Sequence, residues 1–381
     1  MSADLRRADA GEFESAEDLS RNRIIVGDAR SATNDLPSDS IDCIVTSPPY
    51  FRLRNYQHGS QIGLEQNVDE WVDEMTTVLR GLKRVLKPSG SLWLNLGDTF
   101  STHERQGARP KSLLLAPERL AMALTQDGWM LRNKVIWSKP NPMPTSVRDR
   151  LSCTWEIVYF FVRSNSYYFD LDAIRVPHRS RNTKTHDPRT AWSVPNSWRG
   201  PSSGSNTGLD RLKALGLPGH PLGKNPGDVW TIPTAGYRGE HHAVFPARLA
   251  RVPILATCPE RVCFGCGVPW TRDRSRRIDV SARHRLNQGR QLQQRCPCNA
   301  QVGTTPGIVL DPFIGSGTTA IVAEALNRDW LGIELNPEFA TLATDRITVA
   351  RYTLTGQPSG LATNNTTSND TKGGANERTT T

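Results

Sequence analysis

The chain has 381 residues, 37% of them hydrophobic, and carries a net charge of +9 from 47 basic and 38 acidic side chains. This length and composition are typical of a globular protein with one large domain and insertions, or with two ordinary domains. No apolar run approaches the roughly 18 residues that span a membrane, and the first residues lack the apolar core of a secretion signal. We therefore expect a cytoplasmic protein without a membrane partner.

Strand and helix patterns alternate along the first half of the chain. The polar ends, 1–22 and 353–381, cannot bury enough apolar surface to order and are predicted to be disordered tails. Between them the sequence predicts, in order, strands at 23–28 and 41–46, a helix at 68–86 closed by KPSG, a strand at 91–98, a helix at 112–127, and strands at 129–137 and 154–162. Such alternation predicts a mostly parallel sheet flanked by helices.

Two basic segments interrupt this pattern. Residues 175–240 are rich in Pro, Gly, Ser and Arg, and residues 258–306 hold nine basic and three acidic side chains. A regional positive charge favours a polyanionic partner, and two solvated loops kept soluble by arginine are the alternative. Around them the sheet pattern resumes, with a helix at 245–256, a strand at 307–313, a helix at 318–326, a strand at 330–335 and a helix from 337.

The seven cysteines point to metal rather than to disulfides, since their number is odd and no secretion signal is present. Four form two close pairs separated by a basic loop, the spacing of a tetrahedral structural zinc site: Cys263 and Cys266, then Cys296 and Cys298. Cys258 or His284 could replace one ligand, and free thiols are the alternative. Cys43 and Cys153 lie in apolar runs and are predicted to be core residues.

The stretch GIVLDPFIGSGTTA predicts a cofactor turn. An apolar run ends at Asp311, and Gly315 and Gly317 precede a helix, which lets backbone approach a ligand closely. About twenty residues on, Glu334 ends the next strand and can accept hydrogen bonds from ribose hydroxyls. The third glycine of the dinucleotide fingerprint is missing, so the turn suits S-adenosylmethionine better than a nicotinamide cofactor. An ordinary strand-to-helix turn is the alternative.

Two motifs in a defined order resemble a known family. TSPPY at 46–50 followed by DPFIGSGTT at 311–319 is similar to the amino-group DNA methyltransferases, which act on cytosine N4 or adenine N6, in the permuted beta-group order. Between the two motifs, four further stretches stand in the order expected for the family: GLEQ, SLWLNLGD, WSKPNPMP and HHAVFPARL. The resemblance therefore covers most of 23–350. It implies an α/β, Rossmann-like S-adenosylmethionine-dependent methyltransferase fold: a mostly parallel central sheet with helices on both faces, plus insertions.

The resemblance also implies a division of the chain. Residues 23–174 form the catalytic half, and residues 241–257 with 307–352 form the cofactor-binding half. Residues 175–240 become a DNA target-recognition insertion, in which Arg and Lys contact phosphates and Arg, Asn or Gln read base edges. Residues 258–306 become a zinc-knuckle-like insertion.

The same resemblance assigns catalytic roles to the stiff loop after the second strand. The Ser47 hydroxyl and the Pro48 carbonyl are implied to accept the two hydrogens of the target amino group, while Pro49 fixes the loop and Tyr50 stacks on the flipped base. The implied cofactor-binding residues are Asp28, Asp311, Pro312, Phe313, Gly315, Gly317, Thr318 and Glu334. Asp28 could equally cap a turn. Phe245, implied to wall the methionine end of the cofactor, could equally be a core residue.

The expected function is site-specific transfer of methyl from S-adenosylmethionine to cytosine N4 in duplex DNA. Ser at the first loop position is associated mainly with cytosine N4 in this family, and adenine N6 is the nearest alternative. A non-catalytic zinc-ribbon DNA-binding protein, and methylation of RNA or of a protein amide, are further alternatives. Attack at cytosine C5 would need a cysteine, and the only Pro-Cys pair lies in the cysteine cluster. A cognate restriction endonuclease is left open as a second partner.

Overall fold

The computed structural model describes residues 20–56, 58–178, 220, 222–235, 245–272, 292–299 and 302–355. Nearly all of the two predicted tails, most of the 175–240 insertion and His284 lie outside these residues. At both ends the folded part of the chain extends slightly beyond the predicted limits of 23 and 352. Arg21 forms an ion pair with Asp329 (2.8 Å), and the last helix continues to Thr355.

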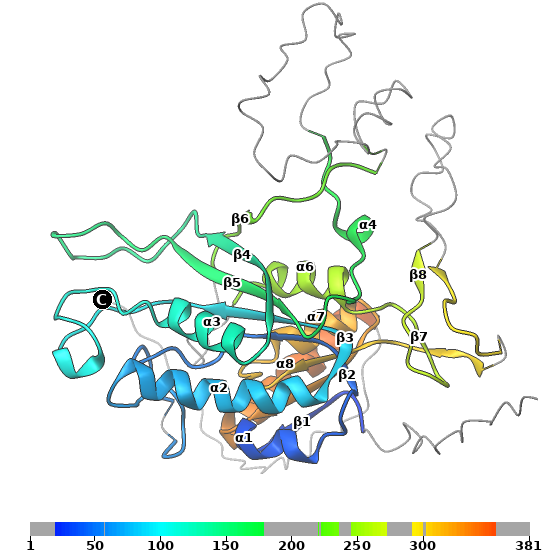
Figure 1. The fold of residues 1–381 in the computed structure, drawn as a ribbon, viewed down its shortest axis with the longest axis horizontal. Coiled ribbons are helices and arrows are strands. Elements are labelled where there is room, and N and C mark those ends of the chain that lie inside the picture. Colours follow the sequence, from blue (N-terminus) through cyan, green and yellow to red (C-terminus); the bar gives the residue numbers. More distant parts are fainter. Residues whose placement is uncertain are drawn as a thin grey trace, which may run out of the picture.

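An eight-stranded sheet forms the centre of the described structure (Figure 1). Across the sheet the strands are β1 (Arg23–Val26), β12 (Asp329–Glu334), β11 (Ile308–Asp311), β2 (Ile41–Thr46), β3 (Leu86–Leu96), β5 (Trp155–Val162), β4 (Met130–Ser138) and β6 (Val229–Thr231). Every neighbouring pair is parallel except those that β5 makes with β3 and β4. The predicted α/β class with a mostly parallel sheet is confirmed.

Helices cover both faces of the sheet. One face carries α1 (Ala29–Ala32), α2 (Val68–Val85) and α3 (Ala116–Gln126), and the other carries α6 (Ala247–Thr257), α7 (Thr318–Ala325) and α8 (Pro337–Thr355). Alternate residues of β5 enter opposite hydrophobic clusters, with Phe161 in one and Phe160 in the other. All six residues of β2 are buried, as expected for a central strand covered on both faces.

One predicted helix stop and one predicted helix start differ from the structure. Helix α2 ends at Val85, one residue before the predicted end, but KPSG does not form a separate turn, because it lies within β3, where the pairing with β2 is irregular. Helix α3 starts at Ala116 rather than at 112. Leu115 before it has a left-handed φ of 54°, which cannot continue a helix, and Pro117 then suits the first turn.

The remaining described elements are short. They are the 3₁₀ turns Thr33–Asp35 and Glu104–Gln106, helix α4 (Leu171–Ile174), and two ladders in the second insertion, β7 (Val262–Cys263) with β10 (Thr304–Thr305) and β8 (Thr271–Arg272) with β9 (Leu292–Gln293).

The prediction that two cysteines belong to the core holds for Cys43 and is wrong for Cys153, which is exposed because it precedes β5 rather than lying within it. Among the described residues, no helix has the length and apolar character to cross a membrane.

Candidate active site

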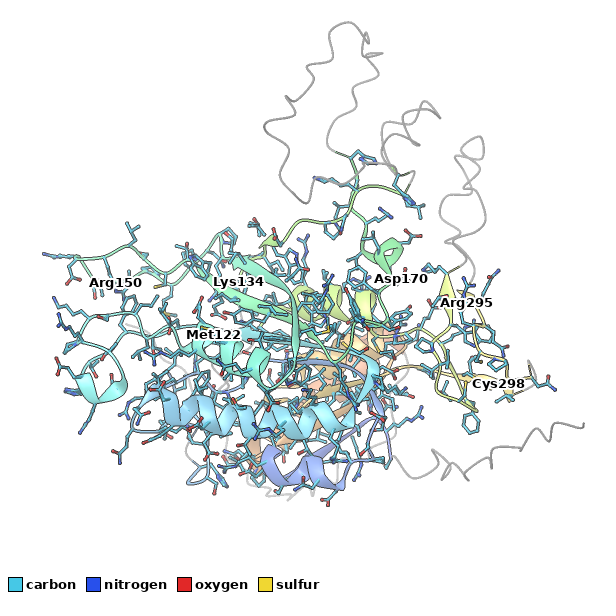
Figure 2. All side chains as sticks on the ribbon, viewed as in Figure 1. Met122, Lys134, Arg150, Asp170, Arg295 and Cys298 are labelled. Carbon is cyan, nitrogen blue, oxygen red and sulfur yellow. The ribbon has the colours of Figure 1, made fainter. Side chains whose placement is uncertain are left out.

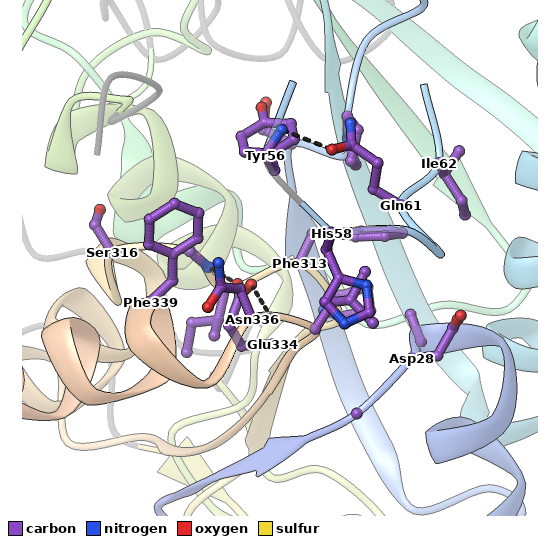
Figure 3. A pocket seen from close by; sticks show the side chains of 18 of the residues that line it. Asp28, Tyr56, His58, Gln61, Ile62, Phe313, Ser316, Glu334, Asn336 and Phe339 are labelled. Atoms are coloured by element: carbon purple, nitrogen blue, oxygen red, sulfur yellow. Dashed lines mark hydrogen bonds between the residues drawn. The ribbon is translucent and has the colours of Figure 1, made fainter. Parts of the chain in front are cut away.

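The candidate site lies where the parallel strands end. The loops after β1, β2, β11 and β12 leave the same edge of the sheet and enclose a pocket of about 850 Å³, counting the part open to solvent (Figure 3). A cleft at the carboxyl ends of parallel strands is the usual place of a small-molecule site in such a sheet. Ser47 and Pro49 line it together with Phe313 and Glu334, so the two sequence motifs meet in one pocket.

The glycine turn after β11 has the predicted shape. Gly315 lines the pocket with a φ of 48°, and Gly317 precedes α7 with a φ of 80°. A Cβ at Gly317 would lie 3.1 Å from Ile347 of α8. Gly317 therefore does not face the pocket, and its role is to let the turn pack against α8. Pro312, Phe313 and Thr318 of the predicted set do line the pocket.

Glu334 is fixed by backbone donors on both sides. One carboxylate oxygen accepts from the Gly315 amide (2.9 Å) and the other from the Asn336 amide (3.0 Å). Burial raises the pKa of Glu334, and these backbone hydrogen bonds partly offset the rise. Each oxygen keeps a second lone-pair direction with which to accept a ligand hydroxyl.

Asp311 turns away from the pocket. Its carboxylate accepts from Thr46 Oγ1 (2.7 Å), Thr319 Oγ1 (2.6 Å) and the Phe313 amide (3.1 Å). Burial raises the pKa of Asp311 to about 6, although the two threonine hydroxyls favour the charged form. Asp311 therefore links β2, the glycine turn and α7, and it does not line the pocket.

Asp28 caps a helix and also lines the pocket. It caps α1 by accepting from the Arg30 amide (2.9 Å), binds the Arg30 guanidinium, and also lines the pocket. Burial raises the pKa of Asp28, but the hydrogen bonds from Arg30 outweigh it and hold the pKa below its usual value. Phe245 likewise lines the pocket.

The Ser47–Tyr50 loop is held from two sides. Trp71 of α2 donates its indole N–H to the Pro49 carbonyl (3.0 Å). The ring of Tyr50 packs against Gly97, where a Cβ would lie only 2.8 Å from Tyr50 Cε2. Ser47 and Pro49 reach the pocket, while Pro48 and Tyr50 lie beside it.

Behind this loop lies a polar network that the sequence analysis missed. Glu156 of β5 accepts from the Tyr50 hydroxyl (2.8 Å) and from Asn95 Nδ2 (2.9 Å), and it forms an ion pair with Lys139. The Tyr50 hydroxyl lies 3.0 Å from Ser47 Oγ. The only sequence signal was a charged residue inside the apolar strand WEIVYFFV.

Other pocket residues were also missed. Tyr56, His58 and Gln61 come from the segment after the Ser47–Tyr50 loop, while Asn336 lies just before α8 and Phe339 lies in its first turn (Figure 3). Gln61 accepts from the Tyr56 amide (2.7 Å), which shapes this segment. No local motif marks these positions, because they reach the pocket only through the fold.

The four predicted metal ligands come together in the second insertion. The sulfur atoms of Cys263, Cys266, Cys296 and Cys298 all lie within 4.8 Å of one another. Cys258 is separate from this cluster, because it ends α6 and is fully buried in the core. In Figure 2 Cys298 and Arg295 lie at one end of the molecule, opposite Arg150.

Comparison with known proteins assigns the family. A family model described as DNA methylase (N6_N4_Mtase) matches residues 41–345. Type II methyltransferase M.SmaI of Serratia marcescens is 34% identical over 347 residues, which span 85% of this chain and 90% of that protein. M.Cfr9I of Citrobacter freundii, also a type II methyltransferase, is 31% identical and spans 87% of this chain and 89% of its own.

A solved structure shares the fold. The PvuII DNA methyltransferase, titled cytosine-N4-specific, superposes with a TM-score of 0.51 at 19% identity, covering 89% of this chain and 94% of that one. The predicted methyltransferase fold is thereby confirmed. The chain belongs to the DNA methylase family of N4 and N6 amino-group methyltransferases, which depend on S-adenosylmethionine.

Proposed function

We propose that the protein methylates the exocyclic N4 of a cytosine in duplex DNA, after flipping that base into the pocket. The observation that carries this proposal is that Ser47 and Pro49 line the same pocket as Gly315 and Glu334. An acceptor loop for an amine therefore faces a site with the features of a cofactor pocket. The type II methyltransferase relatives support DNA as the substrate.

The pocket residues fit S-adenosylmethionine, which supplies the methyl group on a sulfonium sulfur. Glu334 would accept the ribose hydroxyls with its remaining lone pairs, as an acid at this position does in related nucleotide sites. The glycine turn at Gly315 brings backbone close to the ligand. Phe245 and Phe313 supply apolar surface, and Asp28, two residues after the end of β1, also lines the pocket.

The catalytic loop would activate the amine without a charged base. A cytosine amino nitrogen is a poor nucleophile because its lone pair is conjugated with the ring. Acceptors at the Ser47 hydroxyl and the Pro48 carbonyl would bind its two hydrogens and hold the nitrogen in line with the methyl group. In a duplex this amino group is paired and stacked, so the base has to leave the helix. The Tyr50 ring would then stack on it.

Replacing Tyr50 by Ala tests this assignment. The variant should lose methyl transfer to DNA and keep cofactor affinity, because the ring contacts the base and does not line the cofactor pocket. Single-turnover transfer and calorimetric cofactor binding measure the two quantities. Retained transfer would refute the stacking role.

Cytosine is favoured over adenine by Ser47, since Asp or Asn at this loop position accompanies adenine N6 in the family. The basic 175–240 insertion would read the target sequence. Near the described ends of this insertion, Arg175 forms an ion pair with Asp172, and Val176 forms a β-bridge with Lys224. A cognate restriction endonuclease is the second partner that a type II enzyme implies.

We also infer a structural zinc ion at the four clustered cysteines. Zinc–sulfur bonds of about 2.3 Å in a tetrahedron place sulfur atoms about 3.8 Å apart, which fits sulfurs that already lie within 4.8 Å. The two ladders of this module pair only two residues each, too few to be stable alone. The module joins the body through Arg272, which donates to Asp170 (2.6 Å).

Elemental analysis tests the zinc assignment. Wild-type protein should carry about one zinc per chain. Cys263→Ser should release it, while Cys153→Ser, at an exposed cysteine outside the cluster, should not. A metal-free wild type, purified without chelator and given zinc, would refute the assignment.

A further inference from the structure

The polar network behind the catalytic loop has a fixed direction. We propose that Lys139 and Glu156 are positioning residues, which act through Tyr50 to make the Ser47 hydroxyl an obligatory hydrogen-bond acceptor toward the target base. This inference rests on the proposed function, in which Ser47 faces the amino group. It goes further by assigning the source of selectivity for an amino group.

The network starts from a charge that can only donate. The Lys139 ammonium binds one oxygen of Glu156, and the other oxygen accepts from both Tyr50 Oη (2.8 Å) and Asn95 Nδ2 (2.9 Å). Lys139 and Glu156 are largely buried, with side-chain exposures of 18% and 17%. A carboxylate paired with an ammonium accepts and does not donate. The Tyr50 hydroxyl therefore donates its single proton to Glu156.

The direction then passes to Ser47. The distance between Tyr50 Oη and Ser47 Oγ is 3.0 Å, so one of the two hydroxyls donates to the other. Because the Tyr50 proton already points at Glu156, Ser47 is the donor. Asn95 Nδ2 also donates to Tyr50 Oη (3.1 Å), which fills its other acceptor position. The Ser47 oxygen keeps its lone pairs for the pocket and has no proton left to offer there.

Two further observations fit a positioning role rather than a stabilising one. The Asn95 amide donates to Glu156 and Tyr50, while its buried Oδ1 has no hydrogen-bond partner among the described residues. Such an unpaired buried oxygen costs about 1–3 kcal/mol, so this arrangement is not the one that stability alone would select. A buried ion pair such as that of Lys139 and Glu156 is also weak support for fold stability.

The consequence is a choice between base edges. A hydroxyl that can rotate would accept from an amino group or donate to a carbonyl with similar ease. Fixed as an acceptor, Ser47 binds an amino hydrogen and repels a carbonyl oxygen at the same position. The network therefore selects cytosine against thymine or uracil, since a site built for one hydrogen-bond polarity rejects the other.

The test uses variants that change polarity and keep shape. Tyr50→Phe keeps the ring and removes the hydroxyl, and Glu156→Gln keeps the length and removes the charge. Each should lower kcat roughly 10- to 100-fold, the equivalent of one hydrogen bond to a charged group. The cofactor Kd should stay within threefold of wild type. Glu118→Gln is the matched control, because Glu118 pairs with Lys134 on the exposed side of β4, outside the pocket.

Two readouts separate positioning from a general loss of structure. First, the double variant should be no slower than Tyr50→Phe alone, because Glu156 acts only through the Tyr50 hydroxyl. Second, once the methylated position has been mapped, a duplex carrying uracil there should inhibit Tyr50→Phe about 10-fold more strongly than it inhibits wild type. Additive losses, or an unchanged preference against uracil, would overturn the inference. Wild-type protein that transfers no methyl to DNA would instead refute the proposed function.

Discussion

The hydrogen bonds of Glu334 predict how a single isosteric change affects cofactor binding. In Glu334→Gln one side-chain oxygen remains, so it can accept from only one of the two amides at Gly315 (2.9 Å) and Asn336 (3.0 Å). The other amide then faces an NH₂ group, and one ribose hydroxyl loses its acceptor. A bond to a charged group contributes about 1.5–3 kcal/mol. The cofactor Kd should therefore rise roughly 10- to 150-fold.

Isothermal titration with S-adenosylmethionine measures this change directly. The matched control is Glu338→Gln, since Glu338 lies four residues on, is exposed and does not line the pocket. The control should bind the cofactor within threefold of wild type, and both variants should keep their far-ultraviolet circular dichroism. A Glu334→Gln Kd within threefold of wild type would refute the assigned ribose contact.

Three further predictions concern the same site. Burial raises the pKa of Glu334, so cofactor affinity should be full above that raised pKa and should fall as the pH drops through it. In binding titrations between pH 4.5 and 8, Glu334→Gln should show a much weaker dependence on pH. Gly97→Ala places a methyl about 2.8 Å from the Tyr50 ring, so kcat should fall roughly 100-fold with cofactor Kd unchanged in single-turnover and binding assays. Trp71→Phe removes the bond to the Pro49 carbonyl, and urea unfolding should show a loss of about 1–3 kcal/mol; an unchanged midpoint would count against a tethered loop.

The sequence predicted every strand of the central sheet except β6, and the fold explains why the two motifs meet. The patterns at 41–46 and 307–313 mark β2 and β11, which lie side by side and in parallel. Parallel neighbours bring their carboxyl ends to one edge, so loops 265 residues apart in sequence face one pocket. Short-range patterns predicted the two strands, and one rule of topology explains why their loops meet.

The residues behind the loop could not be predicted in the same way. Glu156 reaches Tyr50 only because β5 runs antiparallel to β3, with Ile157 opposite Leu96. A register of this kind depends on the packing of the whole sheet, and a slip of one residue would turn Glu156 to the other face. Asp311 is the converse case, since this residue of the sequence motif is buried and binds Thr319 instead of lining the pocket. Sequence patterns assign residues to motifs, and the fold decides which of them face the ligand.

The most direct test of the account is to identify the methylated nucleoside. Purified protein would be incubated with labelled S-adenosylmethionine and mixed-sequence duplex DNA, and the DNA digested to nucleosides for mass spectrometry. We expect N4-methylcytosine as the labelled product. N6-methyladenine would contradict the choice of cytosine from Ser47, and the absence of any labelled nucleoside, with the cofactor still bound, would contradict DNA as the substrate.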